Sequence, residues 1–164
     1  MKLAKKTSGI ASVGKSEAIE AALAFGWIDG QLDRFDDQFW LMRFTPRGPR
    51  SKWSQVNVET ATRLSAAGRM TPAGLAEVEK AKADGRWDAA YAPQSKAEIP
   101  DDLQAALDAE PAAKAFFATL KGANRYAILY RIHDAKTEKT RAARIDKFVS
   151  MLALGRTIYP TKSS

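Results

Sequence analysis

Apolar positions in the first third of the chain recur first with helical spacing and then with the composition of strands. Residues 16–25 carry apolar side chains on one face of a predicted helix. The segment 27–30 predicts a short strand, and the aromatic-rich segment 39–44 predicts a second strand that Pro46 ends. Because residues 31–38 between them are polar and acidic, we expect an antiparallel hairpin.

Beyond these strands the pattern is helical, with N-cap residues and glycines at the expected helix boundaries. The expected helices run from Asn57 to Gly68, from Thr71 to Gly85, from Pro100 onward, from Pro111 to Gly122, from Asn124 to Lys136 and from Thr137 or Glu138 to Gly155. Residues 86–99 read as a connector that Trp87 and Tyr91 fix to the core. This order predicts an α+β fold, with a small N-terminal antiparallel sheet and its helices followed by an all-helical C-terminal half. We place the α+β region at 1–92 and the helical region at 93–164.

Charge is unevenly distributed along the 164 residues, whose net charge is +7. Residues 121–164 hold ten Lys or Arg against three Asp or Glu, whereas residues 84–110 hold two against seven. A basic segment beside an acidic connector predicts either an anionic partner or pairing between the two segments.

Composition also limits location and chemistry. The chain has no cysteine, which excludes disulfides, thiolate catalysis and cysteine-based zinc sites. We find no export signal and no apolar run of about 18 residues, so we expect no membrane span and a cytoplasmic location. A chain without cysteines would suit the periplasm equally well.

The segment Gly9–Ser16 matches the Walker A pattern, in which backbone amides, a lysine and a serine hold phosphates and Mg²⁺. Its context differs, because residues 1–6 are too short and too charged to form the buried strand that precedes such a loop. We therefore expect a glycine and serine loop leading into a helix N-cap. An enzyme built on this loop remains a third class of function, which would bind ATP or GTP with Mg²⁺.

Other candidates for chemistry are few. Asp29, Asp33, Asp36 and Asp37 could bind a hard cation, but their spacing does not match an EF-hand loop, and a solvated turn is the simpler interpretation. His133 is the only histidine, lies in the middle of a predicted helix and has no nucleophile-elbow motif near it. We therefore predict no catalytic residue, no metal and no cofactor.

Basic residues of the C-terminal helices form a second candidate surface. Arg141 precedes Ile145 by four residues, so it should lie at the edge of the core and need a carboxylate or carbonyl partner. The predicted basic patch consists of Arg125, Arg131, Lys136, Arg141, Arg144 and Lys147. The partner that such a patch suits is nucleic acid.

Several sequence blocks resemble the YdeI/OmpD-associated (bacteriocin-protection, OmdA-type) family, from about Lys2 to Gly155. The blocks are Ala21–Gly30, Phe44–Arg47, Trp53–Ser54 with Asn57, Gly68–Met70, Gly85–Trp87, Ala135–Lys136 and Thr140–Ile145. The resemblance implies a protein linked by family name to protection against bacteriocins and cationic antimicrobial peptides and to an outer-membrane porin. It brings no established catalytic residues.

The segment 43–54 alternates Arg and Lys with aromatic residues and Pro, a composition that suits anion binding and stacking. A binding site of the family would lie where this segment meets the end of the first strand. Its candidate residues are Trp27, Asp29, Arg43, Arg47, Trp53, Ser54 and Asn57. They would form either a pocket for a small anion or a structural ion-pair cluster. We expect a non-catalytic binding or stress-protection protein with a small anion or a protein as partner and with an undetermined oligomeric state; the alternative is a nucleic-acid-binding module.

Overall fold

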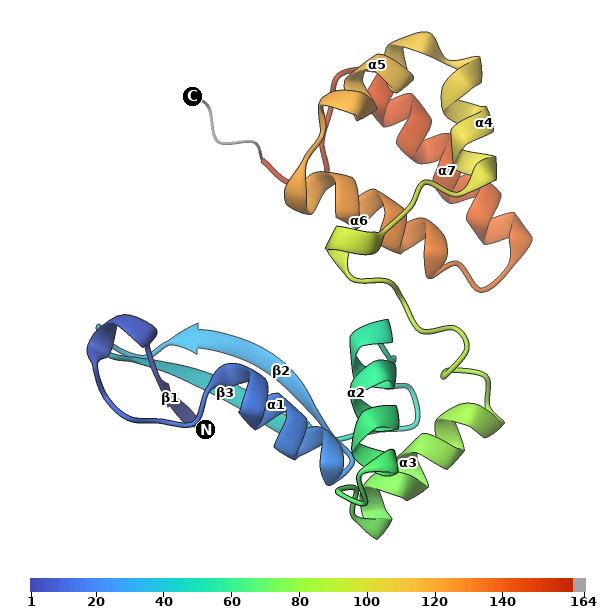
Figure 1. The fold of residues 1–164 in the computed structure, drawn as a ribbon. Coiled ribbons are helices and arrows are strands. Elements are labelled where there is room, and N and C mark those ends of the chain that lie inside the picture. Colours follow the sequence, from blue (N-terminus) through green and yellow to red (C-terminus); the bar gives the residue numbers. More distant parts are fainter. Residues whose placement is uncertain (161–164) are drawn as a thin grey trace. The chain divides into compact units, whose positions relative to one another are not determined.

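The computed structural model describes residues 1–160 and divides the chain into two compact units, Met1–Ala90 and a second that begins at Tyr91 (Figure 1). Unit 1 contains all the strands of the described residues, and unit 2 contains helices only. The predicted α+β class is therefore confirmed.

The sheet of unit 1 has three antiparallel strands in the order β1-β3-β2. The strands are β1 (Lys2–Ala4), β2 (Trp27–Arg34) and β3 (Phe39–Pro46). The predicted hairpin is confirmed, although β2 continues to Arg34 past an irregularity in pairing between Asp29 and Leu32. The pattern missed β1, since three residues are too few to show an alternation.

One face of the sheet is covered by α1 (Lys15–Ala24), which follows a short 3₁₀ turn, η1 (Lys6–Ser8) (Figure 1). Leu3 of β1, Ala18 of α1 and Met42 of β3 form the buried cluster between them. Side chains of a strand alternate between its two faces, so residues in step with Met42, such as Phe44, also face α1.

The helices α2 (Gln55–Ala66) and α3 (Pro72–Ala83) complete unit 1. The predicted N-cap Thr71 is confirmed, but the predicted N-cap Asn57 is wrong. Ser54 caps α2, because its backbone is extended there and its hydroxyl oxygen accepts the Asn57 N–H at 3.1 Å. The core of this region includes Leu23, Trp53, Leu64 and Val78, and the predicted packing of Trp87 against it is confirmed.

The first turn of α3 meets the last residue of α1 at very short range. Thr71 donates both its N–H, at 3.0 Å, and its hydroxyl, at 2.9 Å, to the carbonyl oxygen of Ala24. A Cβ placed on Gly74 would lie only 2.2 Å from this oxygen. A residue without a side chain is therefore required at position 74.

Unit 2 starts with the 3₁₀ turn η2 (Gln94–Lys96) and continues with α4 (Asp101–Ala109), α5 (Pro111–Thr119), α6 (Gly122–His133) and α7 (Glu138–Ala153). The core between these four helices is the largest buried cluster among the described residues. It contains Leu103, Leu107, Phe117, Ile128, Ile132, Ile145, Phe148 and Leu152.

Two boundaries in unit 2 show how caps are chosen. Thr137 caps α7 as predicted, accepting the Thr140 N–H at 3.1 Å. Asn124 is not the cap of α6, which begins at Gly122. The Asn124 amide instead binds the backbone of Tyr159 through two hydrogen bonds, of 2.8 and 3.1 Å. The Asn124 side chain therefore binds a residue far away in the sequence instead of capping its own helix.

Candidate functional site

The Gly9–Ser16 loop lacks the surroundings of a phosphate-binding loop. The strand before it, β1, belongs to an antiparallel sheet and has only three residues. The carboxylate of Glu17 accepts the Gly14 N–H at 2.7 Å, at the start of α1. A phosphate would need this position, and the negative charge already there would repel it.

Of the acidic residues near the hairpin, Asp36 and Asp37 lie in the turn, whereas Asp29 and Asp33 lie in β2. Asp36 Oδ1 accepts the N–H groups of Gln38 and Phe39, at 2.8 and 2.7 Å, which closes the turn. Asp37 pairs with Arg34. Within residues 1–160, no group of three or more His, Asp or Glu side chains could hold a metal ion. His133 is exposed at the last position of α6.

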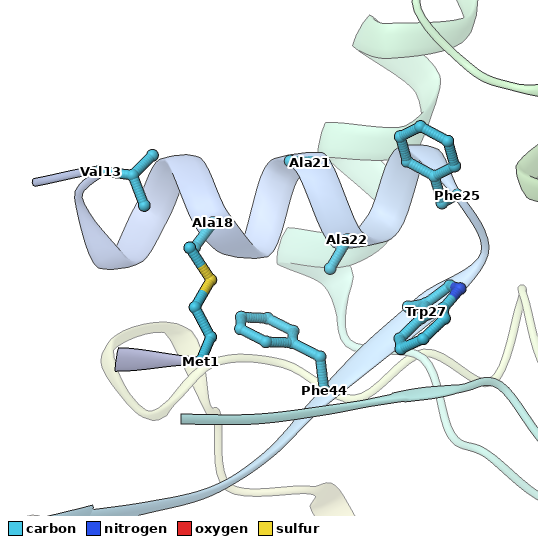
Figure 2. A pocket seen from close by; sticks show the side chains of 8 residues that line it. All are labelled: Met1, Val13, Ala18, Ala21, Ala22, Phe25, Trp27 and Phe44. Atoms are coloured by element: carbon cyan, nitrogen blue, oxygen red, sulfur yellow. The ribbon is translucent and has the colours of Figure 1, made fainter. Parts of the chain in front are cut away.

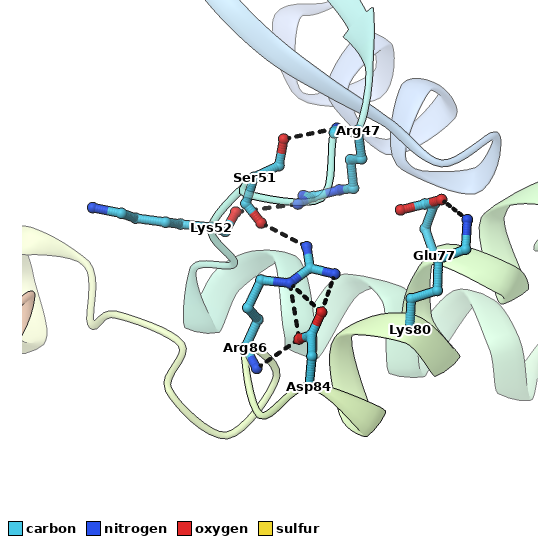
Figure 3. Close-up of polar contacts among 8 residues, drawn as sticks. Arg47, Ser51, Lys52, Glu77, Lys80, Asp84 and Arg86 are labelled. Atoms are coloured by element: carbon cyan, nitrogen blue, oxygen red, sulfur yellow. Dashed lines mark hydrogen bonds and ion pairs between the residues drawn. The ribbon is translucent and has the colours of Figure 1, made fainter. Parts of the chain in front are cut away.

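Arg47 and Trp53 come together, as expected, but inside the protein. The Arg47 guanidinium lies 3.8 Å from the ring centroid of Trp53, and its Nη1 donates to the Lys52 carbonyl at 3.1 Å (Figure 3). The Arg47 N–H also binds the Gly26 carbonyl, at 3.0 Å. Arg47 is only 7% exposed, so its charge helps to hold the β3–α2 loop and is not displayed to solvent.

A second arginine fixes the same loop. Arg86 donates to the Ser51 carbonyl at 3.0 Å and pairs with Asp84 at 2.7 Å (Figure 3). The hydrogen bonds from Arg86 to the Asp84 carboxylate hold the pKa of Asp84 below its ordinary value. Beside this pair, the ring of Trp87 packs at 4.9 Å from that of Trp53. Arg47 and Trp53 of the basic and aromatic segment 43–54 are therefore engaged within unit 1, whereas the side chains of Arg43 and Arg50 are exposed.

The remaining candidates of the first site separate onto different faces. Ser54 and Asn57 form the cap of α2. Trp27 and Asp29 lie on the sheet face that carries α1, since Asp29 pairs with Phe44. Arg43, the residue before Phe44, projects from the opposite face. The candidates do not form one pocket, because the alternation of a strand separates Arg43 from Asp29.

The structure forms a different site in unit 1, an apolar groove of about 350 Å³ between α1 and the sheet (Figure 2). It is lined by Met1, Val13, Ala18, Ala21, Ala22, Phe25, Trp27 and Phe44. Phe25 is 60% exposed and Trp27 is 41% exposed. Large exposed side chains gathered around an apolar hollow are typical of a surface that binds a partner.

An acidic residue also lies on the sheet face that forms this groove. Asp29 lies on the groove face of β2, opposite Phe44, and its carboxylate makes no side-chain hydrogen bond or ion pair within residues 1–160. Sequence reasoning selected Trp27 and Asp29 but missed Phe25, Phe44 and Val13. For Phe25 the signal was an apolar side chain at the end of a helical face, directly before Gly26.

The predicted basic patch of unit 2 is partly neutralised. Arg141 binds Asp102 through Nε at 2.5 Å and Nη2 at 2.8 Å, so the predicted carboxylate partner is confirmed. These hydrogen bonds lower the pKa of Asp102 and raise that of Arg141. Arg144 donates to the Arg131 carbonyl, and the Arg125 guanidinium lies on the ring of Phe117 at 4.7 Å. Within the patch, only Lys136 and Lys147 are exposed, and the four arginines are half-buried.

No helix within residues 1–160 is long and apolar enough to cross a membrane. Comparison with family models gives two matches. Residues 1–77 match a domain of unknown function (DUF8412), and residues 96–155 match the family described as Bacteriocin-protection, YdeI or OmpD-Associated. No curated protein and no solved structure matches the chain. The match at residues 96–155 is to the family that the sequence blocks resemble, whereas the blocks between Ala21 and Met70 lie within the other model.

Proposed function

We propose that this protein acts without catalysis. The bacteriocin-protection, YdeI or OmpD-associated domain at residues 96–155 supports a role of that type at the level of the family. The protein binds an amphipathic, cationic peptide by taking the apolar side chains of that peptide into the groove of unit 1. The observation that carries this proposal is the groove itself, with Phe25 and Trp27 exposed at its edge.

The chemistry of the groove supports this class of partner. Its lining side chains are all apolar, so binding would gain about 25 cal/mol for each Å² of apolar surface removed from water. Asp29 on the same face would meet a Lys or Arg of the peptide, and its carboxylate has no ion pair with any of the described residues. An acid next to an apolar hollow selects peptides that carry both features.

The test measures binding of a fluorescein-labelled amphipathic peptide of Leu and Lys to the full chain by fluorescence anisotropy. Phe25→Ser should weaken binding about tenfold or more, because a buried Phe contributes roughly 1.5–3 kcal/mol. The matched control is Leu75→Ser, which changes another exposed apolar residue of unit 1 outside the groove. Equal affinities of Phe25→Ser and the unmodified chain would refute the proposal.

The charge preference needs its own measurement. The same peptide with Glu in place of Lys should bind more weakly, and Asp29→Asn should reduce the difference between the two peptides. If Asp29→Asn leaves that difference unchanged, Asp29 does not select the partner.

A nucleic-acid partner for the basic patch is the second candidate, supported by Lys136 and Lys147 on the exposed surface of unit 2. It has less support, because Arg141, Arg144 and Arg125 are engaged internally. The two candidates differ in their response to salt. Binding to phosphates weakens steeply as salt rises, whereas binding in the apolar groove should weaken little.

A further inference from the structure

Unit 2 contains a second hollow, of about 310 Å³, with a different chemistry from the groove. We call it the tyrosine pocket. Tyr126, Tyr130 and Arg131 line it from α6 together with two alanines, and Gln94 and Tyr159 line it from segments before α4 and after α7. Its volume lies at the lower end of the range for small-molecule sites.

The walls of this pocket are held in place by contacts outside it. The Asn124 amide holds the backbone of Tyr159 through two hydrogen bonds. The Tyr126 hydroxyl donates to the Ala92 carbonyl at 2.9 Å, and the ring of Tyr91 meets Tyr130 edge-on at 5.1 Å. A pocket whose rings are fixed in this way loses little conformational entropy when a ligand enters.

Among residues 1–160, Arg131 is the only charged residue that lines the pocket. Its guanidinium lies 5.7 Å from the ring centroid of Tyr159 and makes no hydrogen bond or ion pair within residues 1–160. Burial raises the pKa of Tyr126, with smaller contributions from Tyr91 and Tyr130, so its hydroxyl stays neutral at physiological pH. The described residues therefore give the pocket one positive charge and no negative charge.

These features define the class of ligand. Aromatic pockets without a cationic side chain suit cations, but Arg131 would repel them. A guanidinium with free N–H groups binds carboxylate or phosphate with a forked geometry, and tyrosine rings stack on flat unsaturated rings. We propose that the tyrosine pocket binds a small anion in which a flat ring carries a carboxylate or a phosphate. This site is independent of the peptide groove in unit 1.

The test is a titration of the ¹⁵N-labelled full chain, followed by NMR, with four probes. Benzoate and phenyl phosphate contain both features, and comparing them decides between carboxylate and phosphate. Cyclohexanecarboxylate lacks the flat ring, and benzamide lacks the charge. We expect at least one of the first two to shift the amides of Ala123, Ala127 and Arg131 to saturation. We expect the other two to bind at least about fivefold more weakly.

Variants locate the charge. Arg131→Gln should weaken binding of the preferred anion about 10- to 100-fold, whereas Arg156→Gln, which removes an exposed arginine that does not line the pocket, should not. Failure of both aromatic anions to bind would overturn the proposal. So would equal binding of benzamide or cyclohexanecarboxylate, or equal losses in the two variants. The ligand series on the unmodified chain remains decisive if Arg131→Gln does not fold.

Discussion

Replacing Gly74 by alanine should destabilise unit 1, although the same change usually stabilises a helix. Alanine is favoured over glycine inside a helix by about 1 kcal/mol. At this position, however, the added methyl group would lie 2.2 Å from the Ala24 carbonyl oxygen and 2.9 Å from Met70 Cε. The Met70 side chain can move aside, but the Ala24 oxygen is held by two hydrogen bonds from Thr71.

The expected magnitude follows from these contacts. Forcing a methyl group into a packed site costs about 1–3 kcal/mol, and each hydrogen bond lost at Ala24 costs about 0.5–1.5 kcal/mol more. If both hydrogen bonds are lost, subtracting the helix preference of about 1 kcal/mol leaves a net loss of about 1–5 kcal/mol in the free energy of unfolding. The sign of the effect therefore depends on the close approach of α3 to α1.

Urea unfolding followed by tryptophan fluorescence is the suitable assay, because all four tryptophans lie in unit 1 and Trp53 is almost fully buried. Gly48→Ala is the matched control. Its Cβ would meet only the Ser51 hydroxyl, at 3.9 Å, so we expect no change or a stabilisation of up to about 1 kcal/mol. A Gly74→Ala variant as stable as the unmodified chain would show that the α1–α3 contact is looser than described.

Three further predictions concern caps, cores and charge. Ser54→Ala should cost about 1 kcal/mol in urea unfolding, because it removes the α2 cap, and Asn57→Ala should cost clearly less; equal losses would contradict the cap assignment. Leu152→Ala should cost about 2–5 kcal/mol, measured by urea unfolding in far-ultraviolet circular dichroism, since Leu152 is fully buried; a loss below 1 kcal/mol would show that the unit 2 core is poorly packed. Arg141 lowers the pKa of Asp102 from its ordinary value of 3.8, so the stabilisation is present above that value and is lost as the pH falls through the lowered one. This stabilisation should amount to about 1 kcal/mol or less, because solvent screens the pair, and it should disappear in Asp102→Asn. The measurement is the free energy of unfolding between pH 2 and 5. The assignment is refuted if Asp102→Asn shows the same pH dependence as the unmodified chain.

Local signals predicted most element boundaries. Thr71 followed by Pro72, and Thr137 before the last helix, are caps whose side chains reach only residues three positions away. Such contacts depend on a few neighbouring residues, so sequence reasoning finds them. It failed at Asn57 and Asn124, because each has a side chain suited to capping but lies within the first turn of its helix.

The candidate sites were less predictable. Composition drew attention to arginines and tryptophans, and the predicted site included both Arg47 and Trp53, which are in contact in the structure. It could not show that Arg47 would be buried while Arg43 faces the other side of the sheet. Nor could it show that three tyrosines and Arg131 meet in one pocket, since the Tyr159 backbone is bound by the side chain of Asn124, 35 residues earlier in the chain.

The sequence alone determined the α+β order, most helix boundaries, the lack of cysteine chemistry and the excess of positive charge, because these depend on composition or on residues within one or two turns of each other. The tertiary structure decided which charges remain available and where apolar side chains stay exposed. Those outcomes depend on contacts between segments far apart in the chain, such as Arg141 with Asp102 and Phe44 with α1, and no local pattern encodes them.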